Sequence, residues 1–240
     1  MLVHTLFDLL AWGCAIGAGV LVRFRLPGDA ANHFDHDLHP GYFFYLGIGA
    51  ILGAFLFGTL NLQAGVAWNW QGFRLGHSSA GAIAGGIMGV ELYKWLHDIR
   101  ISTGAIFVVP LAVGLVVGRL GCFFAGLDDF TFGVATDMPW GYDFGDGLHR
   151  HPVQLYESAS MLLFLLMFIP ALIYRRMLML RLGFYLFVLW YALQRFCWEF
   201  LKPYAELAFG LNLFHYLMIL LAIHALWMIR QPRSPNGDSA

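Results

Sequence analysis

Charged residues are scarce in this chain of 240 residues: Asp, Glu, Lys and Arg make up 12% of it, against roughly 25% in soluble domains. The net charge of −1 also leaves no basic excess, which argues against nucleic acid as a partner. Hydrophobic residues, in contrast, reach 59% and aromatic residues 17%. The composition predicts a polytopic membrane protein.

Cysteine is equally sparse. Cys14, Cys122 and Cys197 lie far apart in apolar segments, which is typical of buried small hydrophobes and not of a disulfide or zinc framework. The N-terminal stretch lacks a basic n-region and a small-x-small cleavage site, so we expect a retained span and not a signal peptide. The glycine runs follow no strand, so a Rossmann site fails and no cofactor is expected.

Long apolar runs dominate what is present. A helix needs about 20 apolar residues to cross the bilayer core, and no run shows the alternation of a barrel strand. We expect an all-α polytopic fold in which about seven transmembrane helices form one domain over residues 1–240, with an outer loop at 125–152 and a short polar tail at 231–240. The predicted spans are 4–24, 41–63, 78–97, 104–124, 153–174, 183–201 and 209–229.

Lys and Arg are distributed unevenly between the two sides of these spans. One side receives Arg23, Arg25, Lys94, Arg100, Arg175, Arg176, Arg181, Arg230 and Arg233. The opposite side receives Arg74, Arg150 and Lys202. Because cytoplasmic loops carry the excess of positive residues, we expect the C-terminus in the cytoplasm and the N-terminus and the 125–152 loop outside.

Small residues recur at four-residue spacing, a pattern that lets helix backbones approach closely in lipid. In the "GAIAGGIMG" run, the alternative that the backbone approaches a ligand headgroup stays open. The pairs and triplets are Gly13/Gly17, Gly49/Gly53, Gly81/Gly85/Gly89 and Gly114/Gly118.

Three polar clusters interrupt the apolar runs, where charges are costly and usually face a cavity or partner. Arg119 lies between two glycines, and Arg195 and Glu199 lie at i and i+4, on one helical face. The third cluster is "RHPVQLYES", in which we expect Pro152 in the first helical turn and His151 near the N-cap.

The third cluster also predicts an anion site. Gln154, Glu157 and Ser158 have the spacing of one helical face. A helix N-terminus carries partial positive charge, and Arg150 and His151 lie beside this one. Structural ion pairs, such as Arg195 with Glu199 or Arg119 with Glu157, are the alternative to a site; taken together the clusters favour phosphate recognition, for which arginine is well suited.

Two further segments are rich in polar residues. "NHFDHDLHP" (32–40) holds metal-ligand residue types, but its spacing matches no standard zinc pattern, so we expect a solvated loop and no metal site. The stretch 126–147 holds five aspartates among aromatics and glycines. It predicts an ordered outer loop, with a lid or re-entrant element as alternatives, and it does not fit an EF-hand.

The order of these motifs resembles the prolipoprotein diacylglyceryl transferase family. "GRLGCFFAG" is followed about thirty residues later by "RHPVQLYE", with "PWG" at 139–141 between them, and "QRFCWEFLKP" resembles the family's Arg-x-x-x-Glu helix followed by a basic residue and Pro. The resemblance covers roughly residues 77–203. It implies transfer of the diacylglyceryl group of phosphatidylglycerol to a prolipoprotein cysteine thiol, with a thioether as product and glycerol phosphate as leaving group.

The resemblance also implies site residues. The catalytic candidates are Arg119, His151, Arg195, Glu199, Glu157 and His77. The candidates for substrate binding are Arg119, Arg150, Gln154, Tyr156, Arg195 and Gly121. Arginines would hold the phosphate and stabilise charge on the leaving group, and a base would help to form the thiolate.

The chain departs from the family pattern at three places, one of which is the stretch "LDDFTFG" after "GCFFAG", where the family has a Glu-containing stretch. Cys122 stands where typical members have Asn, and "HSSAGAIAGG" has no His directly before Gly-Gly in the third span. His77 lies a few residues earlier, so His77, His151 and Glu157 all remain candidates for the general base.

These departures leave several functions open. The first is the transferase of the bacterial inner membrane, with its site facing the periplasm or cell exterior and with phosphatidylglycerol or a similar phospholipid and a lipobox-containing prolipoprotein as partners. A diverged paralog with another acceptor and a non-catalytic phospholipid-binding membrane protein are alternatives. A channel or transporter is a weaker one, because the halves show no convincing repeat.

Overall fold

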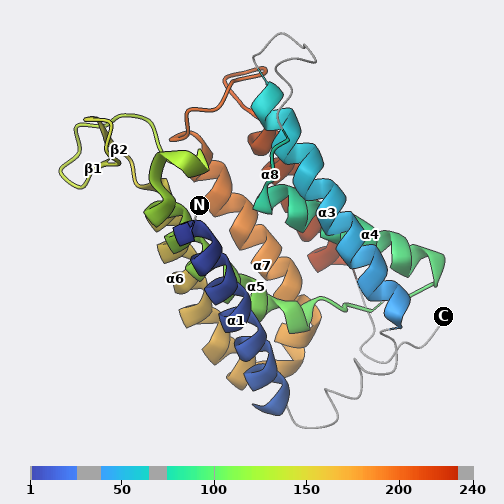
Figure 1. Ribbon diagram of the computed structural model, residues 1–240. Coiled ribbons are helices and arrows are strands. Elements are labelled where there is room, and N and C mark those ends of the chain that lie inside the picture. Colours follow the sequence, from blue (N-terminus) through green and yellow to red (C-terminus); the bar gives the residue numbers. More distant parts are fainter. Residues whose placement is uncertain (1, 26–38, 65–74, 100, 232–240) are drawn as a thin grey trace. The chain divides into compact units, whose positions relative to one another are not determined.

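The computed structural model describes residues 2–25, 39–64, 75–99 and 101–231. Helices make up most of it (Figure 1). They are α1 (Leu2–Arg25), α3 (Pro40–Gln63), α4 (Ser79–Leu96), α5 (Val108–Ala125), α6 (Val153–Tyr174), α7 (Arg176–Glu199) and α8 (Leu213–Arg230), with the short 3-10 helices η2 (Ala105–Phe107) and η3 (Gly126–Asp129). The strands β1 (Tyr142–Asp143) and β2 (His149–Arg150) form an antiparallel hairpin.

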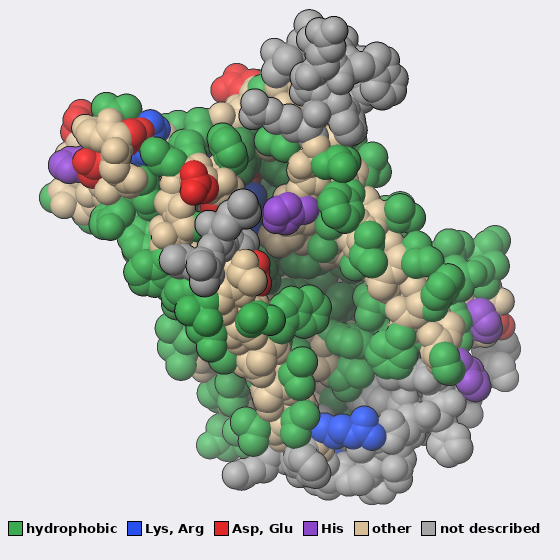
Figure 2. Space-filling view, in the orientation of Figure 1, with side chains coloured by type: hydrophobic (Ala, Val, Ile, Leu, Met, Phe, Trp, Pro, Cys, Tyr) green, Lys and Arg blue, Asp and Glu red, His purple; other side chains and the backbone are tan. Residues whose placement is uncertain are grey.

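Six of these helices are long and apolar enough to cross a membrane within the described residues. The seventh, α4, carries Glu91 and Lys94, which lower its hydropathy. Figure 2 shows hydrophobic side chains over much of the visible helical surface. Largely exposed hydrophobic residues include Trp12, Phe44 and Ile173. Apolar side chains facing outward on long helices are what lipid contact requires. The prediction of an all-α polytopic membrane protein is confirmed, and the count of seven spans stays a prediction.

Two predicted helix starts were wrong. Helix α7 begins at Arg176, seven residues before the predicted 183, because arginine has a high helix propensity and does not end a helix. Helix α8 begins at Leu213 and not at 209. Asn212 sets this start, since its Oδ1 accepts hydrogen bonds from the backbone N–H groups of Phe214 and His215 at 3.0 and 3.2 Å.

The chain divides into two compact units, and the expectation of a single domain stays a prediction. The first unit comprises residues 1–26, 102–203 and 222–231. Within it α1 packs on α5, α5 on α6, and α6 on α7 (Figure 1). Ser158 of α6 donates to the carbonyl of Val116 in α5 at 2.9 Å, and Trp190 of α7 donates to the carbonyl of Ser160 at 3.2 Å. These bonds lie beside a core that includes Val153, Met161 and Phe187.

The second unit is built on the pair α3 and α4. A Cβ on Gly85 would lie 2.8 Å from the Cα of Gly53, and one on Gly81 would lie 2.9 Å from the Cβ of Phe57. Only glycine permits backbones to approach this closely. The prediction of packing for Gly49, Gly53, Gly81, Gly85 and Gly89 is therefore confirmed.

The same prediction was wrong for one pair. Added Cβ atoms on Gly13 and Gly17 would meet nothing within 4 Å in the described residues. Gly114 and Gly118 do face the neighbouring helix, since their added Cβ atoms would lie 3.6 and 4.0 Å from Ala15 and Ala11 of α1. In the α1–α5 contact, Gly114 and Gly118 of α5 thus face alanines of α1, and Gly19 of α1 faces Pro110 of α5, whose Cγ would lie 3.2 Å from an added Cβ.

The predicted outer loop folds onto the ends of α6 and α7. The N–H of Gly133 donates to the carbonyl of His151, and that of Thr136 donates to the carbonyl of His149. The N–H of Val134 donates to the carbonyl of Leu201 at 2.7 Å. The loop is therefore part of the first unit and fixes the segment that follows α7.

The cysteine prediction was wrong at two positions. The three thiols are free; Cys14 and Cys197 are exposed, and Cys122 is half-buried. Cys14 lies on α1 and Cys197 on α7, both candidate spans. Thiols on the outer face of an apolar helix contact lipid as small hydrophobes, so apolar sequence surroundings did not distinguish lipid from protein interior.

Candidate active site

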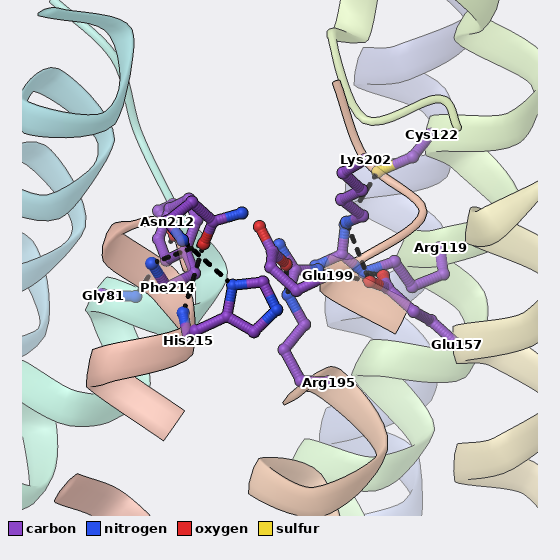
Figure 3. A network of polar contacts seen from close by, with 11 residues as sticks. Gly81, Arg119, Cys122, Glu157, Arg195, Glu199, Lys202, Asn212, Phe214 and His215 are labelled. Carbon is purple, nitrogen blue, oxygen red and sulfur yellow. Dashed lines mark hydrogen bonds and ion pairs between the residues drawn. The ribbon is translucent and has the colours of Figure 1, made fainter. Parts of the chain in front are cut away.

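Glu157 is the centre of a buried ionic network in the first unit (Figure 3). It lies on the face of α6 that turns toward α5 and α7, and its side chain is 2% exposed. Arg119 Nε of α5 lies 2.6 Å from one carboxylate oxygen. The other oxygen accepts hydrogen bonds from Arg195 of α7 and from Lys202 Nζ, the latter at 2.8 Å. One carboxylate thus links three cations.

Arg195 also joins a second carboxylate. Its Nε lies 2.9 Å from Glu199 Oε2, one helical turn further along α7. Both side chains are buried, at 4% and 0% exposure. The two ion pairs that the sequence offered as alternatives to a site, Arg119 with Glu157 and Arg195 with Glu199, therefore both form, and the network holds three cations against two carboxylates.

Gln154 lies one turn before Glu157 on the same face of α6. Its side chain is fully buried, and neither its amide nitrogen nor its amide oxygen has a hydrogen-bond partner among the described residues. Burying an amide unpaired costs about 1–3 kcal/mol. The predicted shared face of Gln154, Glu157 and Ser158 is confirmed, since all three are buried.

A second group of residues lies at the start of α6. Trp140 of the "PWG" stretch donates from Nε1 to the hydroxyl of Tyr156 at 2.8 Å. The Nδ1 of His151 lies 3.3 Å from the same hydroxyl, and the rings of Tyr156 and Trp198 pack 5.3 Å apart. Tyr156 thus ties the loop over residues 125–152 to α6 and α7.

Arg150 makes its contacts outside the buried network. Its Nη2 lies 2.6 Å from Asp146 Oδ2, and its guanidinium lies 5.0 Å from the centre of the Phe132 ring. The Arg150 guanidinium lowers the pKa of the exposed Asp146 carboxyl. Substrate binding by Arg150 stays a prediction, and the contacts that the structure gives it stabilise the hairpin.

The expectation about Pro152 needs correction, and the structure gives Gly121 a packing role. Pro152 is itself the N-cap of α6, so the helix begins at Val153, and His151 lies one residue further out. A Cβ on Gly121 would lie 3.1 Å from Cγ of Phe7 in α1. Gly121 therefore allows α1 to pack closely on α5, and substrate binding by Gly121 stays a prediction.

The remaining histidine candidate is His77. His77 belongs to the second unit, where it precedes Ser78, the N-cap residue of α4, and its side chain is exposed. Its catalytic role stays a prediction. Of the histidine-rich segment 32–40, all but the last two residues lie outside the described residues.

Lys202 is the member of the network that we did not include among the site residues. It follows α7, and its backbone N–H donates to the carbonyl of Glu199 at 3.1 Å, which turns the chain back over the helix end. Burial, reinforced by the charge of Arg195, lowers the pKa of the Lys202 amine to about 8. The basic residue in "EFLKP" marked Lys202 in the sequence as a possible member of the site. The inward direction of its side chain, however, depends on the backbone turn after α7.

Cys122 also approaches the network. Its sulfur lies 4.0 Å from Arg119 Nη1, three residues earlier on α5. Figure 3 shows the thiol near the Arg119 end of the group. The position at which the sequence departs from its family pattern therefore borders the charged cluster.

These features define a class: an integral membrane protein with a buried, arginine-rich ionic network at the ends of its apolar helices. Residues 1–230 match the family described as prolipoprotein diacylglyceryl transferase. The chain belongs to this family. The resemblance read from the sequence motifs is thereby confirmed.

Individual relatives agree with this membership. The phosphatidylglycerol–prolipoprotein diacylglyceryl transferase of Campylobacter lari is 32% identical over 216 residues, covering 78% of this chain and 74% of the relative. The proteins of that name from Legionella pneumophila (strain Corby) and Nitratidesulfovibrio vulgaris (strain DP4) are 34% and 36% identical over 151 and 168 residues. These matches cover 59% and 64% of this chain and 57% and 60% of the relatives, less than two thirds of their length. No solved structure gives a significant match.

Proposed function

We propose that the protein transfers the diacylglyceryl group of phosphatidylglycerol to the cysteine thiol of a prolipoprotein, forming a thioether and releasing glycerol phosphate. The observation that carries the proposal is the buried network of Arg119, Arg195 and Lys202 with two glutamates. An excess of buried cations is costly unless an anion joins them. A phosphodiester supplies that anion, and the planar guanidinium groups suit its oxygens.

In this proposal the glutamates act as positioning residues. Glu157 holds Arg119, Arg195 and Lys202 together, and Glu199 holds the Nε edge of Arg195. The remaining N–H groups of the arginines bind the phosphate and stabilise the charge that grows on it as the C–O bond breaks. Because the cations are fixed before substrate arrives, little reorganisation accompanies the reaction.

Gln154 is the proposed contact for the polar headgroup. A buried amide without a partner pairs with a hydroxyl or ester oxygen of a bound lipid and thereby recovers its desolvation cost. His151 and Tyr156 are proposed to line the site at the start of α6, where the outer loop is attached.

The proposed location is the inner membrane of a bacterium, with the N-terminus outside, the C-terminus in the cytoplasm and α4 as the seventh span. The distribution of Lys and Arg supports this orientation. It would place the outer loop and the network at the periplasmic or external surface, where acceptor proteins emerge from the membrane.

The experiment is reconstitution of the purified protein with phosphatidylglycerol, with and without a lipobox peptide, followed by mass spectrometry. The expected result is a diacylglyceryl mass on the peptide and release of glycerol phosphate. Arg119→Ala should abolish lipid turnover in a protein that still folds, whereas Ala at the exposed Arg181 should leave turnover unchanged. Lipid consumed without peptide modification would mean another acceptor, and lipid bound without consumption would mean a phospholipid-binding protein.

A further inference from the structure

The loop at 125–152 and the end of α5 together form a cleft that the proposed transfer does not use. Its volume is about 380 Å³. The walls come from the last turn of α5, from η3 and from the residues around β1, all within the first unit. Four aromatic rings and two aspartates belong to the lining, which includes no Lys, Arg or His from the described residues. This lining determines which kind of ligand the cleft suits.

The two charges that line the cleft are both negative. Asp128 makes no hydrogen bond or ion pair with another described residue. Asp143 accepts hydrogen bonds from the backbone N–H groups of two glycines at 2.8 and 3.0 Å, and these neutral donors leave its charge in place. Arg150 of the same hairpin is paired with Asp146. The C-terminal end of α5 adds partial negative charge, so the cleft attracts a cation.

The aromatic rings make the cleft suitable for an organic cation. The rings of Phe123 and Tyr142 lie 4.9 Å apart at 53°, and Phe144 lies 5.0 Å from Tyr142 at 68° and 5.6 Å from Phe123 at 69°. Because these rings meet at steep angles and do not stack, they do not cover each other's faces completely. The face of an aromatic ring attracts an ammonium group electrostatically. Tyr142 is 48% exposed, so a ligand can reach its ring.

An ammonium group fits this lining better than a metal ion does. Within the described residues, no group of three or more His, Cys, Asp or Glu side chains is placed to hold a metal. A Ca²⁺ ion takes about six to eight oxygen ligands, and rings do not supply them. An ammonium group donates its N–H groups to carboxylates and places its charge against ring faces. The cleft therefore has the chemistry of a site for an organic ammonium.

We propose that the cleft binds the ammonium headgroup of a zwitterionic phospholipid, at a site separate from that of the anionic donor. The cleft lies at the end of the candidate span Ala105–Asp129, where hydrocarbon gives way to headgroups. Phe124 of its lining is 59% exposed, and aromatic residues are enriched at this level of a membrane. The network around Glu157 holds three cations against two carboxylates, whereas the charges of the cleft are two carboxylates. The two sites thus select lipids by opposite headgroup charge.

The test measures lipid binding to the full chain by native mass spectrometry, with phosphatidylethanolamine, its N-acetylated form and phosphatidylglycerol as probes. N-acetylation removes the positive charge and keeps the rest of the lipid, so the unmodified form should bind about fivefold more tightly or better. Asp128→Asn and Tyr142→Leu should each weaken binding of phosphatidylethanolamine by about two- to fivefold and leave that of phosphatidylglycerol unchanged. Asp137→Asn, the same loss of charge in the same loop but outside the cleft, should bind like the wild type.

The two variants keep the proposal testable, because either one suffices if thermal unfolding shows that the other is misfolded. Equal binding of phosphatidylethanolamine and its N-acetylated form by the wild type would overturn the proposal, as would cleft variants that bind like Asp137→Asn. A soluble lysine peptide that binds the wild type more tightly than the lipid does, and loses affinity in Asp128→Asn, would assign the cleft to a protein amine and overturn the lipid assignment. All of these readouts are binding, so their outcome does not depend on whether the protein transfers a diacylglyceryl group.

Discussion

At the scale of single residues, Glu157 is the side chain on which the network depends most. It pairs with cations from α5, from α7 and from the segment after α7. Glu157→Gln keeps the shape and removes the charge, which leaves Arg119, Arg195 and Lys202 buried with Glu199 as the remaining carboxylate of the network. Removing one partner of a buried ionic group typically costs about 3–5 kcal/mol. We expect a lower thermal unfolding temperature in detergent and loss of transfer.

The control for this change is Asp137→Asn, the same loss of charge at an exposed loop position. It should leave both the unfolding temperature and the transfer rate close to wild type. An unfolding temperature of Glu157→Gln equal to that of the control would show that the network contributes nothing to stability.

A substitution of Gln154 can distinguish a structural role from a binding role, because the two roles predict different effects on the KM for phosphatidylglycerol. Methionine has a similar length and no polar atoms to satisfy. If the buried amide served packing alone, Gln154→Met would be neutral or stabilising, because an unpaired polar group is removed. We expect instead an increase of about tenfold in the KM for phosphatidylglycerol, at unchanged or higher thermal stability, since a hydrogen bond to ligand is lost. An unchanged KM would contradict headgroup binding.

Most of the network could be predicted from residue types and spacing. Arg195 and Glu199 lie one helical turn apart, and Glu157 and Arg119 are charges inside apolar runs that need partners. Lys202 could not, because its inward direction follows from the backbone turn at Glu199 and from the loop bond at Leu201. The pairing of Arg150 with Asp146 could not be predicted from the sequence either, since it depends on the β1–β2 hairpin.

At the scale of elements, the contact between α3 and α4 depends on glycine at its closest points. Leucine at Gly85 would force the helices apart, because even a Cβ would lie 2.8 Å from the Cα of Gly53. A Cβ at Gly47 of α3 would meet nothing within 4 Å. Both changes gain the same helix propensity, so the difference between them measures packing. We expect Gly85→Leu to lower stability by about 1–3 kcal/mol or more relative to Gly47→Leu, as read by thermal unfolding.

The β1–β2 hairpin should respond to acid through Asp146. Its hydrogen bond from Arg150 lowers the pKa of the carboxyl below the usual 3.8. The contribution of this pair is therefore fully present above pH 3.8 and is lost as the pH falls through the lower, folded-state pKa. Fluorescence of Trp140, which the loop holds against Tyr156, should report the loosening. In Arg150→Gln the change should move to higher pH, and an unmoved midpoint would show that Arg150 does not set it.

The apolar runs predicted the helices well because lipid-facing and core-facing positions are both apolar, so the whole circumference of a span carries the signal. The same property hides which face is which. Cys14, Cys197, Gly13 and Gly17 look like interior residues in the sequence, yet the structure leaves the two thiols exposed and the two glycines without close contacts. The start of α7 was missed because arginines within its first two turns resemble a loop.

At the scale of the whole molecule, the orientation in the membrane decides whether the proposed chemistry has access to its acceptor. The excess of Lys and Arg on one side of the predicted spans favours an external site. Asp137 of the outer loop and Arg175, between α6 and α7, lie at opposite ends of α6 and are both exposed. They are therefore matched reporters for the two faces.

Cysteines placed at these two positions, in a chain whose Cys14, Cys122 and Cys197 are replaced by alanine, can be labelled in spheroplasts with a membrane-impermeant maleimide. Asp137→Cys should react in intact spheroplasts, and Arg175→Cys only after the membrane is permeabilised. The cysteine-free chain should take no label, which shows that the signal comes from the introduced thiols. If Arg175→Cys alone were labelled in intact spheroplasts, the orientation would be opposite to the predicted one. The network would then lie on the cytoplasmic side, and this would exclude an acceptor that is modified after it has crossed the membrane.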